Sequence, residues 1–128
     1  MAAPNIVNVT SILGKTVGKD INNVADSDIT VLSGQTDKVL KVNIIRAANV
    51  NAIENDSVTI NFVDSASTSF CLVKDLEVTI RTALPALEGS IYLAETDKIT
   101  MSRLNNGGLS ADSATVHGII SYEELDDA

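Results

Sequence analysis

Apolar and small polar residues alternate along much of this chain, and turn-forming residues interrupt the alternation at short intervals. The alternation is clearest over 40–44, 57–62 and 98–102, where an apolar side chain takes every second position. A period of two places apolar side chains on one face of a strand and polar side chains on the other. No helical period competes over a comparable length, so the pattern predicts a small all-β protein.

Turn-forming residues divide the chain into short strands and one ambiguous opening segment. The predicted strands are 29–32, 39–48, 57–63, 70–73, 77–82, 90–93, 98–104 and 116–122. Residues 5–10 alternate loosely and fit either a first strand or an extended arm. Gly14 and Gly18 are predicted to break the segment after residue 10, and the polar stretch 20–28 is predicted to be a loop.

Neighbouring segments suggest how some of these strands pair. We expect 39–48 and 57–63 to be adjacent antiparallel strands, because one loop joins them. We expect 90–93 and 98–104 to form a hairpin around a four-residue loop. Pro85 has no N–H to donate to a sheet, so its segment is predicted to mark an edge or a corner.

Length and composition favour one all-β domain. A chain of 128 residues is the size of a single domain, and it can bury roughly two-thirds of its unfolded surface. Its apolar residues are mostly Val, Ile, Leu and Ala, which suit the space between two packed sheets. We therefore expect one antiparallel β-sandwich of jelly-roll or related Greek-key type over 1–128, with a possible N-terminal arm at 1–10 and an acidic tail at 123–128.

The formal net charge of −8 limits the partners. Nucleic acid is not expected, because its binding depends on clustered Lys and Arg, and the basic residues here are scattered. The acidity serves solubility, or it matches a basic partner surface. The opening residues lack the charged and apolar regions of a signal peptide, and no apolar run reaches the length of a membrane span. We therefore expect synthesis in a cytoplasm and no membrane partner.

Residues that could carry chemistry are few. Cys71 is the single cysteine, which excludes an internal disulfide, and its apolar surroundings predict a buried thiol. His117 is the single histidine, and no nucleophile motif accompanies it. Asp26 and Asp28 could offer oxygen ligands, but the glycine and distal glutamate of a calcium loop are missing. We predict no catalytic residue, no cofactor and no metal; a hydrolase with paired carboxylates is the least favoured alternative.

Three segments resemble a known family. The chain opens MAAPNIVNVT at 1–10 with GKT at 14–16, carries IYLAETDKI at 91–99, and ends with ISYEEL at 120–125. These segments resemble small virion structural proteins of tailed bacteriophages, mainly marine and cyanobacterial phages, and 41–50 fits the same pattern. Two features depart from that family: the corner before the predicted hairpin lacks its "V-P-A" sequence, and the loop after Gly107 is longer.

The resemblance implies a non-enzymatic capsid decoration or cement protein on the outside of the virion. Such a protein would bind the major capsid protein lattice, stabilise it, and form a homo-oligomer, with a trimer favoured. An arm could add a strand to a neighbouring sheet through backbone pairing. The candidate partner-binding residues are Ala2, Ala3, Pro4, Asn5, Ile6, Val7, Asn8, Val9, Glu123 and Glu124.

Two other classes stay open. A tail, neck or fibre-attachment component would share the fold and the lack of chemistry, and it would differ in copy number. A host-glycan-binding module would need exposed aromatic rings, for which Tyr92 and Tyr122 are the candidates, because the chain has only two Tyr, two Phe and no Trp.

Overall fold

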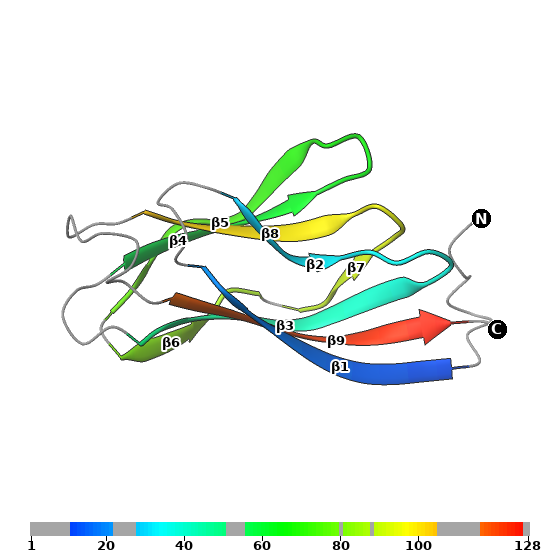
Figure 1. Cartoon of the computed structure of the whole chain (residues 1–128), viewed down its shortest axis with the longest axis horizontal. Helices are drawn as coiled ribbons and strands as arrows, with labels where there is room; N and C mark the ends of the chain where they lie inside the picture. The colour runs from blue at the N-terminus through cyan, green and yellow to red at the C-terminus, as the bar shows by residue number, and fades with distance from the viewer. Residues whose placement is uncertain are drawn as a thin grey trace.

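The protein folds into two antiparallel β-sheets that pack face to face, and the residues described contain no helix (Figure 1). This computed structural model describes residues 11–21, 28–50, 56–79, 81–87, 89–104 and 116–126. The predicted all-β sandwich is confirmed. The predicted arm at 1–10 and the candidate ligand Asp26 lie outside the described residues.

Nine strands make up the described part of the chain. They are β1 (Ser11–Asp20), β2 (Ile29–Ser33), β3 (Val39–Asn49), β4 (Asp56–Val63), β5 (Ser69–Val78), β6 (Thr82–Pro85), β7 (Ile91–Leu93), β8 (Lys98–Leu104) and β9 (Val116–Asp126). Most of them occupy segments that the alternation predicted, because the same apolar side chains that set the period fill the space between the sheets.

The strand order is that of a jelly roll. One sheet has the order β1–β9–β3–β6, and the other has the order β2–β8–β4–β5. β7 also pairs with β3, along 40–42, whereas β6 pairs along 46–49, so the two act as halves of one interrupted edge strand. If β6 and β7 are counted as one strand, β8 becomes the seventh strand and β9 the eighth. The two sheets then have the orders 1-8-3-6 and 2-7-4-5, which is the jelly-roll arrangement.

Alternate residues of the central strands form the core between the two sheets. Leu40 and Val42 of β3 face Ile60 of β4 and Ile99 and Met101 of β8, and all five are fully buried. Fully burying a side chain of this size contributes about 1.5–3 kcal/mol before entropy is subtracted. The hydrophobic effect therefore selects the register in which these positions point inward.

A β-bulge changes which side of β3 faces the core. The register between β3 and β9 shifts between Val42 and Ile44. Ile45 consequently points inward and is fully buried, whereas Ile44 points outward with 45% of its surface exposed. The strict alternation that placed Ile44 beside Val42 is wrong at this position, because the bulge inserts one residue into the strand.

The two glycines near the start of the chain do not interrupt it. Residues 11–20 form β1, which pairs with β9 along its whole length, so the predicted break at Gly14 and Gly18 is wrong. The predicted loop 20–28 is wrong for Asp20, which ends β1, and residues 22–27 lie outside the described part of the chain. Glycine weakens a strand but does not forbid it, and the pairing with β9 supplies the missing stability.

Two predicted pairings are also wrong. β3 and β4 follow one another in sequence but lie in different sheets, and the same holds for β7 and β8. The segment 94–97 therefore crosses from one sheet to the other instead of closing a hairpin. Jelly-roll topology alternates between sheets, so consecutive strands at these points become partners across the core and not along a ladder.

The ends of the later strands differ from the prediction as well. β5 is longer than 70–73 and includes the first two residues of the segment predicted as a separate strand at 77–82, whereas Thr82 begins β6. Cys71 is exposed on this edge strand, so the predicted buried thiol is wrong. β9 continues to Asp126, so the predicted acidic tail at 123–128 is wrong for Glu123 to Asp126, which are paired with β1 and β3. The prediction that Pro85 marks an edge is confirmed.

Candidate functional site

The predicted partner-binding residues fall into two groups. Ala2–Val9 lie outside the described residues. Glu123 and Glu124 are neighbours on β9, and the alternation of the strand sends their side chains to opposite sides of the sheet. The structure therefore separates two carboxylates that the sequence placed together.

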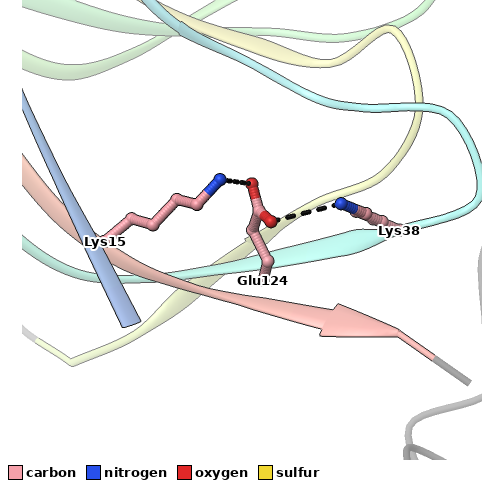
Figure 2. A network of polar contacts seen from close by, with 3 residues as sticks. All are labelled: Lys15, Lys38 and Glu124. Atoms are coloured by element: carbon pink, nitrogen blue, oxygen red, sulfur yellow. Dashed lines mark hydrogen bonds and ion pairs between the residues drawn. The ribbon is translucent and has the colours of Figure 1, made fainter. Parts of the chain in front are cut away.

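Glu124 faces the interior of the sandwich and binds two lysines of its own chain (Figure 2). Its Oε2 accepts a hydrogen bond from Lys15 Nζ at 2.9 Å, and its Oε1 accepts one from Lys38 Nζ at 3.2 Å. Lys15 lies on β1 and Lys38 precedes β3, so one carboxylate joins three parts of the five-stranded sheet. With only 3% of its side chain exposed, Glu124 is a structural residue.

The two lysines change how the cluster titrates. The hydrogen bond from Lys15, with that from Lys38, holds the pKa of Glu124 below its ordinary value of 4.5, against the opposing effect of burial. The hydrogen bond to Glu124 raises the pKa of Lys15 above its ordinary value of 10.5. Both groups are charged over the whole range between those two values, so the cluster is intact at neutral pH.

Glu123 faces outward on the same strand and stays accessible. Its Oε2 lies 4.0 Å from Lys41 Nζ on β3, and about a third of each side chain is exposed. Ion pairs of this kind contribute little to stability, roughly 0–1 kcal/mol. Of the two predicted glutamates, Glu123 is the one whose carboxylate a partner can reach.

Glu123 lies on the side of the five-stranded sheet that points away from the core, where most side chains are at least partly exposed and Val39 and Leu125 are buried. We call this side the outer face. The registers of β1, β9, β3, β6 and β7 place these residues on it: Ile12, Gly14, Thr16, Gly18, Asp20, His117, Ile119, Ser121, Glu123, Leu125, Val39, Lys41, Ile44, Arg46, Ala48, Ala83, Pro85 and Tyr92.

This outer face mixes exposed apolar side chains with charges of both signs. Ile44 and Tyr92 are each about half exposed, at 45% and 46%. His117 Nε2 lies 4.0 Å from Asp20 Oδ1, so the single histidine contacts the neighbouring strand and faces away from the core. Between Ile12 and Asp20, the outward positions of β1 are Gly14, Thr16 and Gly18, so the middle of this strand presents no large side chain on the outer face.

A buried ion pair closes one end of the core and was not predicted. Arg103 of β8 is fully buried, and its Nη1 donates to Asp56 Oδ2 of β4 at 2.9 Å. Asp56 Oδ1 also accepts a hydrogen bond from the Ser57 backbone N–H. Within the described residues, Nε and Nη2 of Arg103 have no hydrogen-bond partner. The alternation did not predict this buried pair, because it leads one to expect an apolar residue at the inward position that Arg103 occupies.

An apolar groove of about 540 Å³ lies at the open side between the two sheets. It is lined by Leu72 and Val73 of β5 and, from β6 to β7, by Pro85, Ala86, Leu87 and Ile91. None of these side chains offers a hydrogen bond or an aromatic ring, which glycan recognition requires. Among the described residues that line the groove, there is also no ionisable group of the kind that catalytic chemistry needs.

The aromatic candidates for glycan stacking are separated in the structure. Tyr122 points into the sandwich and is 7% exposed, whereas Tyr92 lies on the outer face. A ring that is buried in the core cannot stack on a sugar, so the suggested role of Tyr122 is wrong. Within the described residues, no group of three or more His, Cys, Asp or Glu side chains is placed to hold a metal ion.

The segment 91–99, which carries part of the family resemblance, fixes the crossover between the sheets. Asp97 Oδ2 accepts a hydrogen bond from the Ala94 N–H, and Glu95 Oε1 accepts one from the Asp37 N–H, at 2.9 and 2.8 Å. A Cβ added to Gly34 would lie 2.0 Å from the Ala94 carbonyl oxygen, so this turn requires glycine opposite it. The charged residues of this segment therefore maintain the fold.

No family model matches this chain, and no curated protein matches it. Across the described part of the chain there is no helix long and apolar enough to span a membrane.

Proposed function

We propose that this protein is a non-enzymatic structural component of a bacteriophage virion, and specifically a capsid decoration or cement protein. It binds the outside of the major capsid protein lattice and stabilises it. Many copies act together, as a homo-oligomer for which we favour a trimer. Neither nucleic acid nor a membrane is a partner in this proposal.

The observation that carries the proposal is the open outer face of a rigid jelly-roll sandwich. A decoration protein must adhere at many equivalent positions, and a flat sheet face with mixed apolar and charged side chains suits that task. The predicted arm at 1–10 directly precedes β1, which is the edge strand of this face. A jelly roll serves many functions, so the resemblance of 1–10, 91–99 and 120–125 selects the virion among them.

Deleting residues 2–9 tests the role of the arm. We expect the deleted protein to keep the urea unfolding midpoint of the full chain, because buried residues from Ile21 to Leu125 already fill the space between the sheets. We expect its occupancy on purified capsids to fall, because a strand added to a neighbour's sheet contributes backbone hydrogen bonds. Full occupancy with the deletion would show that the arm does not hold the protein on the capsid.

Salt tests the electrostatic part of the contact. If Glu123 pairs with a basic residue of the capsid, molar salt should release the protein from particles, and Glu123→Gln should lower the salt concentration at which release occurs. Asp64→Asn is a matched control, since Asp64 lies in the β4–β5 turn, away from the outer face. Retention of both variants in molar salt would instead indicate apolar and backbone contacts.

A further inference from the structure

The outermost strands of the two sheets differ in how well they are protected from pairing with another chain. β2 has only five residues, and its register with β8 shifts between Thr30 and Leu32. β5 has two register shifts against β4, and Asp75 within it has a left-handed φ of 52°. The edge formed by β6 and β7 is interrupted and contains Pro85. Short length, bulges and proline are the usual devices that prevent edge-to-edge association.

β1 has none of these three devices, and the edge charges that also discourage association are limited to Lys15, Lys19 and Asp20. It has ten residues, pairs with β9 without a register shift, and contains no proline. Nine of its ten residues are exposed, and the tenth, Val17, is half-buried. A Cβ added to Gly14 or Gly18 would meet no atom within 4 Å, so the isolated chain has no steric need for glycine there. Glycine within a strand is typical of a place where another backbone approaches closely.

We infer that β1 pairs antiparallel with β1 of a second copy of this chain, across a two-fold axis at Thr16. The contact joins two five-stranded sheets into one continuous sheet. We favour a second copy of this chain as the partner, because the other edges in the described part of the chain are protected. Among the described edges, β1 is therefore the one that can pair with another β1. A strand that pairs with itself generates a closed two-fold contact.

The charges of β1 select this register. With Thr16 opposite Thr16, Gly14 lies opposite Gly18, Lys15 opposite Val17, and Leu13 opposite Lys19. A register shift of two residues in one direction places Lys15 of one copy opposite Lys15 of the other. The same shift in the other direction places Lys15 of one copy opposite Lys19 of the other. Like charges directly opposite one another destabilise a strand pair. Leu13, which is 52% exposed in the single chain, is covered by the aliphatic part of Lys19.

Cysteine cross-linking tests the pairing and its register in the purified protein. Cys71 is exposed, so every variant is made in a Cys71→Ser background. Under mild oxidation, Thr16→Cys should form a disulfide-linked dimer, whereas Ile12→Cys, on the same side of β1, should not. A mixture of Ile12→Cys and Asp20→Cys chains should cross-link to each other, because the register places these residues opposite one another.

Sedimentation tests the association without cross-linking. The wild-type chain should shift with concentration from 13.5 kDa toward twice that mass. Thr16→Lys should remain at 13.5 kDa, because it places two lysines at the axis, whereas Ser65→Lys in the exposed β4–β5 turn should associate like wild type. Unchanged circular dichroism of both variants shows that they fold.

Three results would overturn the inference. A wild-type chain that stays monomeric at every concentration would do so, as would a dimer that persists in Thr16→Lys. A Thr16→Cys chain that cross-links no better than Ile12→Cys would reject the two-fold register at Thr16. The two-fold contact goes beyond the proposed function and does not depend on it, since it is measured on the purified chain.

Discussion

At the scale of single residues, Glu124 shows why charge alone does not identify a binding residue. It belongs to an acidic sequence that reads as a tail, yet its carboxylate is buried and holds Lys15 and Lys38. Its neighbour Glu123 has the same side chain and the opposite environment. Adjacent residues of a strand point to opposite faces of the sheet, so Glu124 is a buried structural carboxylate and Glu123 is an accessible one.

Replacing Glu124 with glutamine should destabilise the protein by about 2 kcal/mol, because it removes two hydrogen bonds between charged groups. Glu123→Gln is the matched control and should change the free energy of unfolding by less than about 1 kcal/mol. Urea unfolding at neutral pH measures both. Equal effects of the two substitutions would contradict the assignment of Glu124 as the structural carboxylate.

The same cluster predicts how stability depends on pH. The pKa of Glu124 is lowered on folding, so its contribution is present above about 4.5 and is lost as the pH falls through the lower folded value. The pKa of Lys15 is raised, so its contribution is present below 10.5 and is lost as the pH rises through the higher folded value. Urea unfolding of Glu124→Gln should show a shallower acid limb than wild type. An unchanged acid limb would contradict this linkage.

Arg103 and Asp56 form the other charged pair with consequences for stability. Arg103→Ala should cost about 3–5 kcal/mol, because it leaves the buried carboxylate of Asp56 without its partner. The double variant Arg103→Met with Asp56→Leu should recover a large part of that loss, since both charges are removed together. Thermal unfolding of the three proteins checks this, and a double variant less stable than Arg103→Ala would refute it.

At the scale of strands, the two glycines Gly118 of β9 and Gly18 of β1 differ in the space around them. Gly118 of β9 faces the core, where an added Cβ would lie 2.5 Å from Met101 Sδ. Gly118→Ala should therefore destabilise the protein by about 1–3 kcal/mol through overpacking. Gly18→Ala on β1, where the space is open, should change stability by less than about 0.5 kcal/mol. Urea unfolding at low protein concentration distinguishes them; equal losses would contradict this difference in packing.

The period of two was sufficient to predict the sandwich, because burial of alternate apolar residues dominates the energy of central strands such as β4 and β8. It failed where another interaction decides the structure. The bulge before Ile44 depends on pairing with β9, and β1 depends on a partner about a hundred residues away. Consecutive strands were assigned to one sheet because sequence distance was the only available measure of proximity. The inward Arg103 and the outward Cys71 were missed for the same reason: each depends on neighbours from another strand.

At the scale of the whole molecule, the two proposals describe different contacts. In the proposed function, the outer face and the predicted arm attach the protein to a capsid lattice; in the further inference, the edge of β1 that the described residues leave unpaired joins two copies. A trimer would leave three such edges at its surface, and two-fold pairing of those edges would link neighbouring trimers. A continuous layer of linked jelly rolls would stabilise a shell, because each contact is repeated at every equivalent position.

The copy number of this protein in purified virions is the decisive quantity for the proposed function. Quantitative mass spectrometry gives its ratio to the major capsid protein. We predict a ratio near one copy per capsid subunit, because a decoration protein occupies the whole lattice. A few to a few dozen copies per particle would place it in the neck, tail or fibres, and its absence from virions would contradict a structural role in the particle.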